Sequence, residues 1–202
     1  LKRALEAGQV VTLDEVDNFV DGAAVARIGD ANFAALERFP AEQVILVREN
    51  AICVTMTEML NVEGVVLEPA GALALTALRG LPATTIRGKK IVILVSGGNF
   101  DFDRLPDVKE RAMRHLGLKK YLILRLPQRP GALKDFLGLL GPEDDIARFE
   151  YLKKSARNFG SVLIGIETLR PENFAALFDR LQEADMIYRD ITNDAILAEF
   201  LI

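Results

Sequence analysis

The segment Lys89–Asp101, which reads KKIVILVSGGNFD, constrains the fold of this chain more than any other stretch. Ile91–Val95 is an unbroken run of apolar strand formers, which is typical of a central strand buried on both faces of a parallel sheet. The run ends abruptly at Ser96-Gly97-Gly98-Asn99. Ligands of open α/β sheets bind where strands end in such loops, because glycine lets the backbone approach a ligand closely. The four loop residues alone also fit a plain strand-to-helix turn.

A second segment of small residues lies about twenty-five residues upstream, where Glu68-Pro69-Ala70-Gly71-Ala72 leads into the Ala/Leu-rich run Leu73–Leu78. Pro69 fits the first position of a helix, where its missing N–H costs nothing. The three small residues after it would keep the helix start narrow enough to lie against a bound ring. Glu68 would then lie at the mouth of the helix, either as a capping or solvated carboxylate or as part of a site.

A third segment lies upstream and consists of Val20–Val25 (VDGAAV) followed by Arg27–Asp30 (RIGD). The order and spacing of the three segments resemble the pattern of the fold-type II family of pyridoxal-phosphate (PLP) enzymes. Within that family the chain is most similar to the threonine dehydratases. The protein tunes PLP through the group that faces its pyridine nitrogen, and a neutral hydroxyl suits removal of an α-proton followed by loss of a β-hydroxyl.

The resemblance implies a set of cofactor-binding residues. Ser96 would contact the ring nitrogen, and Gly97, Gly98 and Asn99 would shape the same wall of the pocket. Glu68 would lie near the ring edge or the 3-hydroxyl of the ring. The backbone of Gly22 and Ala23 would run past the cofactor.

Two parts of the family pattern do not occur in this sequence. The family's Schiff-base lysine stands in a Ser-x-Lys-x-Arg-Gly segment and its phosphate loop is rich in glycine, and neither pattern is found here. The chain also begins at Leu1 and enters the family pattern midway. The resemblance therefore predicts the C-terminal portion of a longer enzyme, without a catalytic residue of its own in this segment and inactive by itself.

Composition limits the other classes of function. Among 202 residues, 50% are hydrophobic and 27% are charged, with a net charge of −4 and both signs interspersed, so we expect a globular chain that binds neither nucleic acid nor membranes. The single Cys53 excludes an internal disulfide, fits a reducing cytoplasm and is expected to be a small core residue. His115 is the only histidine and is expected at a helix end, which argues against a zinc or Ser/His/Asp site.

The first half of the chain alternates between helix and strand patterns. Strands are expected at Val44–Val47 and Ile91–Val95, and helices at 32–38, 51–60, 68–78 and 107–115. This alternation predicts part of a doubly wound α/β domain over residues 1–105, followed by a linker helix over 106–118.

From Lys119 onward the pattern predicts an α+β unit with the order β-α-β-β-α-β, which is that of a ferredoxin-like fold. Strands are expected at 121–126, 146–152, 161–169 and 187–191, with a polar hairpin link at Lys153–Gly160 and helices at 133–140 and after Pro171. Strict alternation over 146–152 would place Ile146, Arg148, Glu150 and Leu152 on one face and Ala147, Phe149 and Tyr151 on the other.

A second resemblance covers this half. Leu126–Leu133 (LPQRPGAL) is similar to the strand-to-helix loop of ACT-type amino-acid-sensing domains, and Phe149-Glu150-Tyr151 to a strand of the threonine dehydratase regulatory domain. A helix start after Pro-Gly has free N–H groups that can receive a carboxylate. The resemblance implies an amino-acid effector site at Gln128, Arg129, Gly131, Ala132, Glu150 and Tyr151, although Arg129 and Glu150 fit solvated surface charges equally well.

The two resemblances together imply PLP-dependent conversion of L-threonine to 2-oxobutanoate and ammonia in isoleucine biosynthesis. They also imply feedback by a branched-chain amino acid, isoleucine first, and a homo-oligomer in the cytoplasm. Two alternatives stay open from the residues alone. One is a serine dehydratase or another fold-type II β-eliminating lyase, and the other is a free-standing, non-catalytic module that binds an amino acid or a partner.

Overall fold

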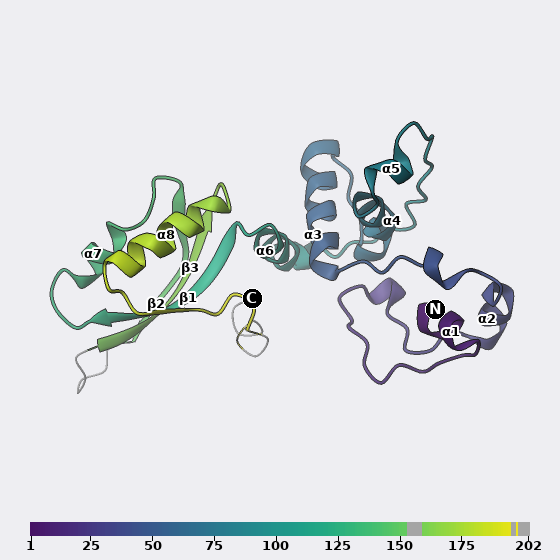
Figure 1. The fold of residues 1–202 in the computed structure, drawn as a ribbon, viewed down its shortest axis with the longest axis horizontal. Helices are drawn as coiled ribbons and strands as arrows, with labels where there is room; N and C mark the ends of the chain where they lie inside the picture. Colours follow the sequence, from purple (N-terminus) through teal and green to yellow (C-terminus); the bar gives the residue numbers. More distant parts are fainter. Residues whose placement is uncertain (153–158, 195–196, 198–202) are drawn as a thin grey trace. The chain divides into compact units, whose positions relative to one another are not determined.

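The computed structural model describes residues 1–152, 159–194 and 197. The chain divides into two compact units, Leu1–Val108 (unit 1) and Lys109–Ile202 (unit 2). Figure 1 labels helices α1 to α8 and strands β1 to β3. One helix, α6 (Leu105–His115), begins in unit 1 and ends in unit 2.

Unit 1 is built from helices and irregular segments. Before α6 these are α1 (Lys2–Ala7), η1 (Asp21–Ala23), α2 (Asp30–Leu36), η2 (Ala41–Gln43), α3 (Glu49–Glu58), η3 (Met59–Glu63), α4 (Pro69–Arg79), α5 (Ala83–Ile86) and η4 (Phe102–Arg104). Its buried side chains come mainly from α3, from the start of α4 and from Val108 of α6. Cys53 is fully buried in α3, as predicted for a small core residue.

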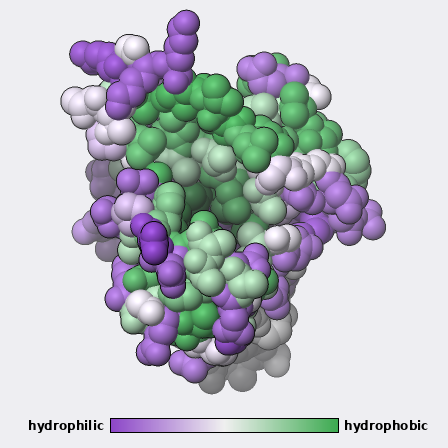
Figure 2. Space-filling model, turned by 90° about the vertical axis from the view of Figure 1, so that its right-hand side faces the viewer, coloured by the Kyte–Doolittle hydropathy of each residue, from purple (hydrophilic) through white to green (hydrophobic). Residues whose placement is uncertain are grey.

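The two strands predicted in this unit are not present in the structure. Residues 1–108 are all described, and their only β pairing is an isolated antiparallel bridge between Thr12 and Arg27. A strand forms only where a neighbouring strand takes up its backbone N–H and C=O groups, and neither Val44–Val47 nor Ile91–Val95 has one here. Both runs therefore keep apolar side chains in contact with solvent, with Val92 96% and Leu94 81% exposed. Figure 2 shows apolar surface gathered on the face turned toward the viewer.

Helices α3 and α4 are joined by two side-chain contacts. The hydroxyl of Thr76 donates a hydrogen bond of 2.8 Å to the hydroxyl of Thr55, and both residues are buried. About one turn further on, Arg79 of α4 pairs with Glu58 of α3 at the surface. The Thr76 hydroxyl also lies 2.9 Å from the carbonyl of Ala72 in its own helix, so the threonine pair links α4 to α3 without being the only hydrogen bond open to that hydroxyl.

Unit 2 has the predicted β-α-β-β-α-β order. Its elements after α6 are β1 (Lys119–Pro127), α7 (Ala132–Leu137), β2 (Asp144–Leu152), β3 (Phe159–Thr168), α8 (Glu172–Glu183) and β4 (Tyr188–Asp190). The strands form one antiparallel sheet in the order β2-β3-β1-β4. One face of the sheet packs against α7 and α8, with a core that includes Leu122, Leu124, Phe136, Ile164 and Leu177. Residues 153–158 of the predicted hairpin link lie outside the described residues.

The predicted alternation in β2 is broken by a bulge. The register between β2 and β3 shifts between Ile146 and Arg148, so Ile146 lies opposite Ile166 while Phe149 lies opposite Ile164. Both partners belong to the helix-covered core, so Ile146 shares a face with Phe149 and not with Arg148. The extra residue of the bulge, Ala147, reverses which side chains point outward in the first part of the strand.

A buried cluster of charges joins the last turns of α6 to the sheet. Lys119 of β1 is 8% exposed, and its ammonium lies 2.5 Å from Glu110 of α6 and 2.9 Å from Glu167 of β3. Burial alone would lower the pKa of Lys119, but the hydrogen bonds to the two carboxylates outweigh it and hold that pKa well above its usual value. The guanidinium of Arg114 lies beside the same cluster and donates to the carbonyl of Thr192.

Three further observations concern the described part of the chain as a whole. His115 is exposed at the end of α6, where the sequence predicted it. The described residues contain no group of three or more His, Cys, Asp or Glu side chains arranged to hold a metal ion. The helices they form are all too short or too polar to cross a membrane.

We predict that Lys119→Met destabilises unit 2 by roughly 3–5 kcal/mol, because two carboxylates lose the ammonium that compensates their burial. Tyr121, Tyr151 and Tyr188 are the only tyrosines, all lie in unit 2, and the chain has no tryptophan. Urea unfolding followed by tyrosine fluorescence therefore measures this unit alone.

Lys120→Met is the matched control. Its ammonium pairs with Asp190 at 2.7 Å in a more exposed setting, so its removal is expected to cost about 1 kcal/mol or less. Equal losses for the two variants would contradict a special role for the Lys119 cluster.

Candidate functional site

The start of helix α4 lies against the loop that follows Ile91–Val95. Pro69 occupies the first position of α4, as predicted, and Glu68 is the N-cap residue. The backbone N–H of Glu68 points to the carbonyl of Gly97 at 3.4 Å. Two of the segments singled out in the sequence are therefore neighbours in space.

This contact depends on two glycines. A Cβ placed on Gly71 would overlap the carbonyl group of Gly97, and a Cβ placed on Gly97 would overlap the carboxylate of Glu68. Neither glycine has a positive φ, so the backbone conformation itself does not require glycine at either position. Glycine is needed at position 71 because the backbone of the loop lies where a side chain would stand, whereas at position 97 the space is taken by the movable carboxylate of Glu68.

The third segment reaches the same place through Gly22. A Cβ on Gly22 would lie 3.1 Å from the Cβ of Ala70, tighter than an ordinary contact. The preceding residues are held by Arg104, which donates to the carbonyl of Phe19 at 2.8 Å and lies over its ring. The structure thus brings Gly22, Glu68 and Gly97 together around the first turn of α4.

The remaining predicted cofactor residues lie beside this contact. Ser96, Gly98, Asn99 and Ala23 are exposed, and Glu68 and Gly97 are half-buried. The backbone of Gly98 packs near the carbonyl of Val66. The result is a wall of backbone and small side chains with one hydroxyl, one amide and one carboxylate, which suits a flat ligand that needs close approach and a few hydrogen bonds.

A second candidate site is a cavity of about 380 Å³ in unit 2, between α7 and β2. Its walls are largely apolar and carry two basic side chains. It is lined by Leu126, Pro127, Arg129, Gly131, Ala132, Leu133, Lys134, Leu137, Phe149 and Tyr151. Leu133, Leu137, Phe149 and Tyr151 are each about 40% exposed, which is unusual for a group of large apolar side chains unless they receive a ligand or a partner.

Polar groups stand at one side of this cavity. The guanidinium of Arg129 contacts Asp135 at 2.7 Å and donates to the carbonyl of Pro130, and a guanidinium has further N–H groups to offer. Gly131, at φ 85°, is the N-cap of α7. Because α7 has only six residues, an anion here would be held mainly by Arg129 and Lys134, and less by the helix start than the sequence suggested.

Four of the six predicted effector residues line the cavity: Arg129, Gly131, Ala132 and Tyr151. Gln128 is not among its lining residues. Glu150 lies on the opposite face of the sheet and pairs with Arg148 at 2.7 Å, so it is not placed to contact a ligand in this cavity. The residues that sequence reasoning missed are mainly Leu133 and Leu137, whose spacing of four on one side of a short helix was the available signal.

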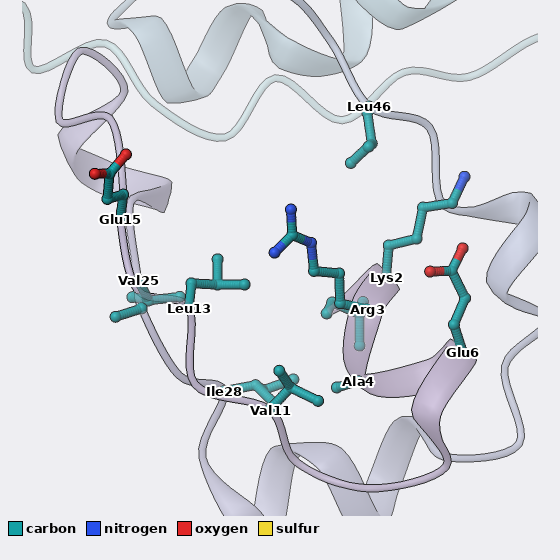
Figure 3. Close-up of a pocket in the computed structure, with 12 residues that line it drawn as sticks. Lys2, Arg3, Ala4, Glu6, Val11, Leu13, Glu15, Val25, Ile28 and Leu46 are labelled. Atoms are coloured by element: carbon teal, nitrogen blue, oxygen red, sulfur yellow. The ribbon is translucent and has the colours of Figure 1, made fainter.

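Two other hollows contain none of the predicted cofactor residues. One, of about 330 Å³ in unit 1, lies between α1, the segment 11–28 and Leu46, and the side chain of Arg3 points into it (Figure 3). The other lies beside the cavity between α7 and β2, shares Pro127, Arg129 and Ala132 with it, and extends toward Asp185 and Ile187.

Comparison with known proteins matches both units to family models. Residues 1–97 match the pyridoxal-phosphate-dependent enzymes, and residues 110–201 match the C-terminal regulatory domain of threonine dehydratase. A biosynthetic L-threonine dehydratase IlvA from Halalkalibacterium halodurans is 42% identical over 203 residues, which cover all of this chain and 48% of the relative. The chain belongs to the threonine dehydratase family.

A second curated relative gives the same picture. The IlvA enzyme of Bacillus subtilis is 44% identical over 98% of this chain and 46% of its own length. The chain thus spans about half the length of the curated relatives it matches. Among solved structures, the processed form of threonine deaminase isoform 2 from Solanum lycopersicum aligns with 55% of this chain and 32% of its own, at 32% identity and a TM-score of 0.47.

We predict that Gly71→Ala lowers the stability of unit 1 by at least 1–3 kcal/mol, because the new methyl group meets rigid backbone and not a movable side chain. Thermal unfolding followed by circular dichroism at 222 nm should show an earlier loss of helix. The tyrosine signal, which comes only from unit 2, should keep its own midpoint.

Gly80→Ala, at the other end of the same helix, is the matched control. Its Cβ would meet the nearest atom, the carbonyl oxygen of Ala77, at an ordinary 3.5 Å. Its stability is expected to stay within about 0.5 kcal/mol of the parent. A Gly71→Ala chain that unfolds at the parent's temperature would show that α4 and the loop are free to separate.

Proposed function

We propose that this chain is part of a PLP-dependent threonine ammonia-lyase, which converts L-threonine to 2-oxobutanoate and ammonia. The observation that carries the proposal is the convergence of Gly22, Glu68 and Gly97 at the start of α4, in a chain of the threonine dehydratase family. We propose residues 1–105 as the catalytic portion, 106–118 as the linker helix and 119–202 as the regulatory domain.

The residues at this wall fit the cofactor. Because Gly22, Ala23 and Gly98 are exposed and carry little or no side chain, a planar ring can lie close to the backbone there. When bound, PLP withdraws electrons from the α-carbon of an amino acid, which eases removal of its proton. The Ser96 hydroxyl would donate a hydrogen bond to the pyridine nitrogen, and the Gly97 and Gly98 backbone would keep water away from that side of the ring.

Glu68, Asn99, Gly22 and Ala23 would complete this side of the pocket. The carboxylate of Glu68 lies beside Gly97 at the helix mouth, where it would meet the ring edge and not its centre. This chain's contribution to the reaction is therefore to bind and orient the cofactor.

We further propose that the cavity between α7 and β2 binds a branched-chain amino acid, isoleucine first, as a feedback effector. Arg129 and Lys134 would receive its carboxylate, while Leu133, Leu137 and Phe149 would contact its side chain. The match of residues 110–201 to the regulatory domain of threonine dehydratase supports amino-acid binding by this unit. An effector acts only if it binds one arrangement of an enzyme better than another, so we propose a homo-oligomer as the setting.

The lone, buried Cys53 is compatible with a cytoplasmic enzyme.

In the full-length enzyme we predict that Ser96→Ala weakens PLP binding by roughly 2- to 10-fold, corresponding to the loss of one hydrogen bond of about 0.5–1.5 kcal/mol. Turnover of threonine should fall as well, while the fold is kept. Fluorescence titration with PLP and assay of 2-oxobutanoate measure the two effects. The control is Thr84→Ala, which removes an exposed hydroxyl from α5. If both variants hold PLP as tightly as the parent, Ser96 is only a turn residue.

For the regulatory unit we predict that the 202-residue chain binds isoleucine in calorimetric titration, and that Arg129→Gln weakens this binding about ten-fold or more. A hydrogen bond from a charged donor contributes about 1.5–3 kcal/mol. Arg148→Gln, an arginine on the opposite face of the same sheet, should leave affinity unchanged. If isoleucine, valine and leucine all fail to bind at millimolar concentration, the effector role is refuted for this chain.

A further inference from the structure

One wall of the effector cavity rests on a glycine. Tyr151 of β2 lies opposite Val162 of β3, and Gly160 stands two residues before Val162 on the same face of the sheet. A Cβ built on Gly160 would lie 2.5 Å from Cε2, 2.9 Å from the hydroxyl oxygen and 3.0 Å from Cζ of Tyr151. The outer half of the tyrosine ring therefore lies directly over the Gly160 backbone.

The reason for glycine at this position is space and not backbone conformation. Gly160 is buried and does not have a positive φ, so any residue could adopt its backbone angles in β3. Diagonal neighbours on adjacent strands are within reach of an aromatic side chain, and a glycine there lets the ring lie down on the sheet. Across the sheet, Gly160 faces Leu126 of β1, which itself lines the cavity.

We infer that Gly160 is a positioning residue that sets the size of the effector cavity, and with it the choice among branched-chain amino acids. By leaving room for the Tyr151 ring on the sheet, it keeps the space between β2 and α7 open for the larger of these side chains. The inference rests on the effector function proposed above, since it concerns which ligand that cavity selects.

A methyl group at position 160 would act on the ligand only through the ring. The ring is the far end of a flexible side chain, so it would turn away from the sheet and toward the side occupied by Leu133 and Leu137. The cavity would become smaller while Arg129 and Lys134 stay in place. In an apolar pocket one methylene group is worth about 10- to 200-fold in discrimination, so isoleucine would lose far more affinity than valine.

The test compares isoleucine and valine in calorimetric titrations of the 202-residue chain. The variants are Gly160→Ala, Tyr151→Ala, and the double variant. We expect Gly160→Ala to weaken isoleucine binding at least ten-fold and valine binding less than three-fold. In the Tyr151→Ala background the same Gly160 change should have no further effect on the ratio, because the ring that transmits it is gone.

Gly165→Ala is the matched control. Gly165 also lies on β3 beneath a tyrosine, with a built Cβ 2.7 Å from Cε1 of Tyr121, but on the face of the sheet away from the cavity. If the substitutions only weakened β3 in general, Gly160→Ala and Gly165→Ala would change amino-acid binding alike. We expect the ratio of isoleucine to valine affinity to change only in Gly160→Ala. Tyrosine fluorescence checks that each variant is folded.

The outcomes separate the two proposals. If the parent chain binds isoleucine and the ratio is unchanged in Gly160→Ala, the cavity is an effector site but Gly160 does not set its size. If the parent binds neither amino acid, the effector function fails and this inference fails with it. If Gly160→Ala does not fold, the amino-acid preference of Tyr151→Ala tests the inference instead. Removal of the ring should shift preference toward a side chain larger than isoleucine, such as phenylalanine, and an unchanged preference overturns the inference.

Discussion

The approach of the Gly97 carbonyl to Gly71 is the contact on which unit 1 depends. It sets the distance between α4 and the loop after Ile91–Val95, and it leaves no room for a side chain at Gly71. The hydrogen bond between Thr76 and Thr55 links the same helix to α3. A wall made of backbone and small side chains follows directly, because two segments this close can present only main-chain atoms and the short polar groups at their edges.

The same kind of constraint recurs in unit 2 with a different result. At Gly160 the missing Cβ makes room for an aromatic ring and not for backbone, so the sheet gains an apolar surface beside α7. In both units a glycine with an ordinary φ stands where a neighbour needs the space. Glycines of this kind are informative in a structure, because strand or helix geometry alone would accept alanine at the same position.

The buried charges around Lys119 contribute to specificity of the fold more than to its stability. The Lys119 cluster buries an ammonium between Glu110 and Glu167 and so ties the end of α6 to the regulatory sheet. A buried ion pair adds little net stability compared with apolar residues, but it penalises any arrangement that separates its members. The cluster therefore specifies where the last turns of α6 lie on the sheet more than it strengthens unit 2.

The sequence by itself determined the family, the two-part organisation and the order of elements in unit 2. These follow from local patterns: periodic apolar residues, Pro69 at a helix start, and three short motifs at fixed spacing. The alternation rule failed at Ile146, because a bulge adds one residue and reverses the faces without a distinct signal in the composition. The apolar runs Val44–Val47 and Ile91–Val95 predicted strands that the structure does not contain, since such runs show strand propensity but not whether a partner strand is present.

Only the tertiary structure decided which residues meet. Glu150 and Tyr151 are neighbours in the sequence, yet they lie on opposite faces of the sheet and only the tyrosine lines the cavity. Gly160 carried no functional signal in the sequence, because its role depends on a ring from another strand. Contacts between strands and helices are fixed by register and by packing distance, and neither can be read from the spacing of residues along one segment.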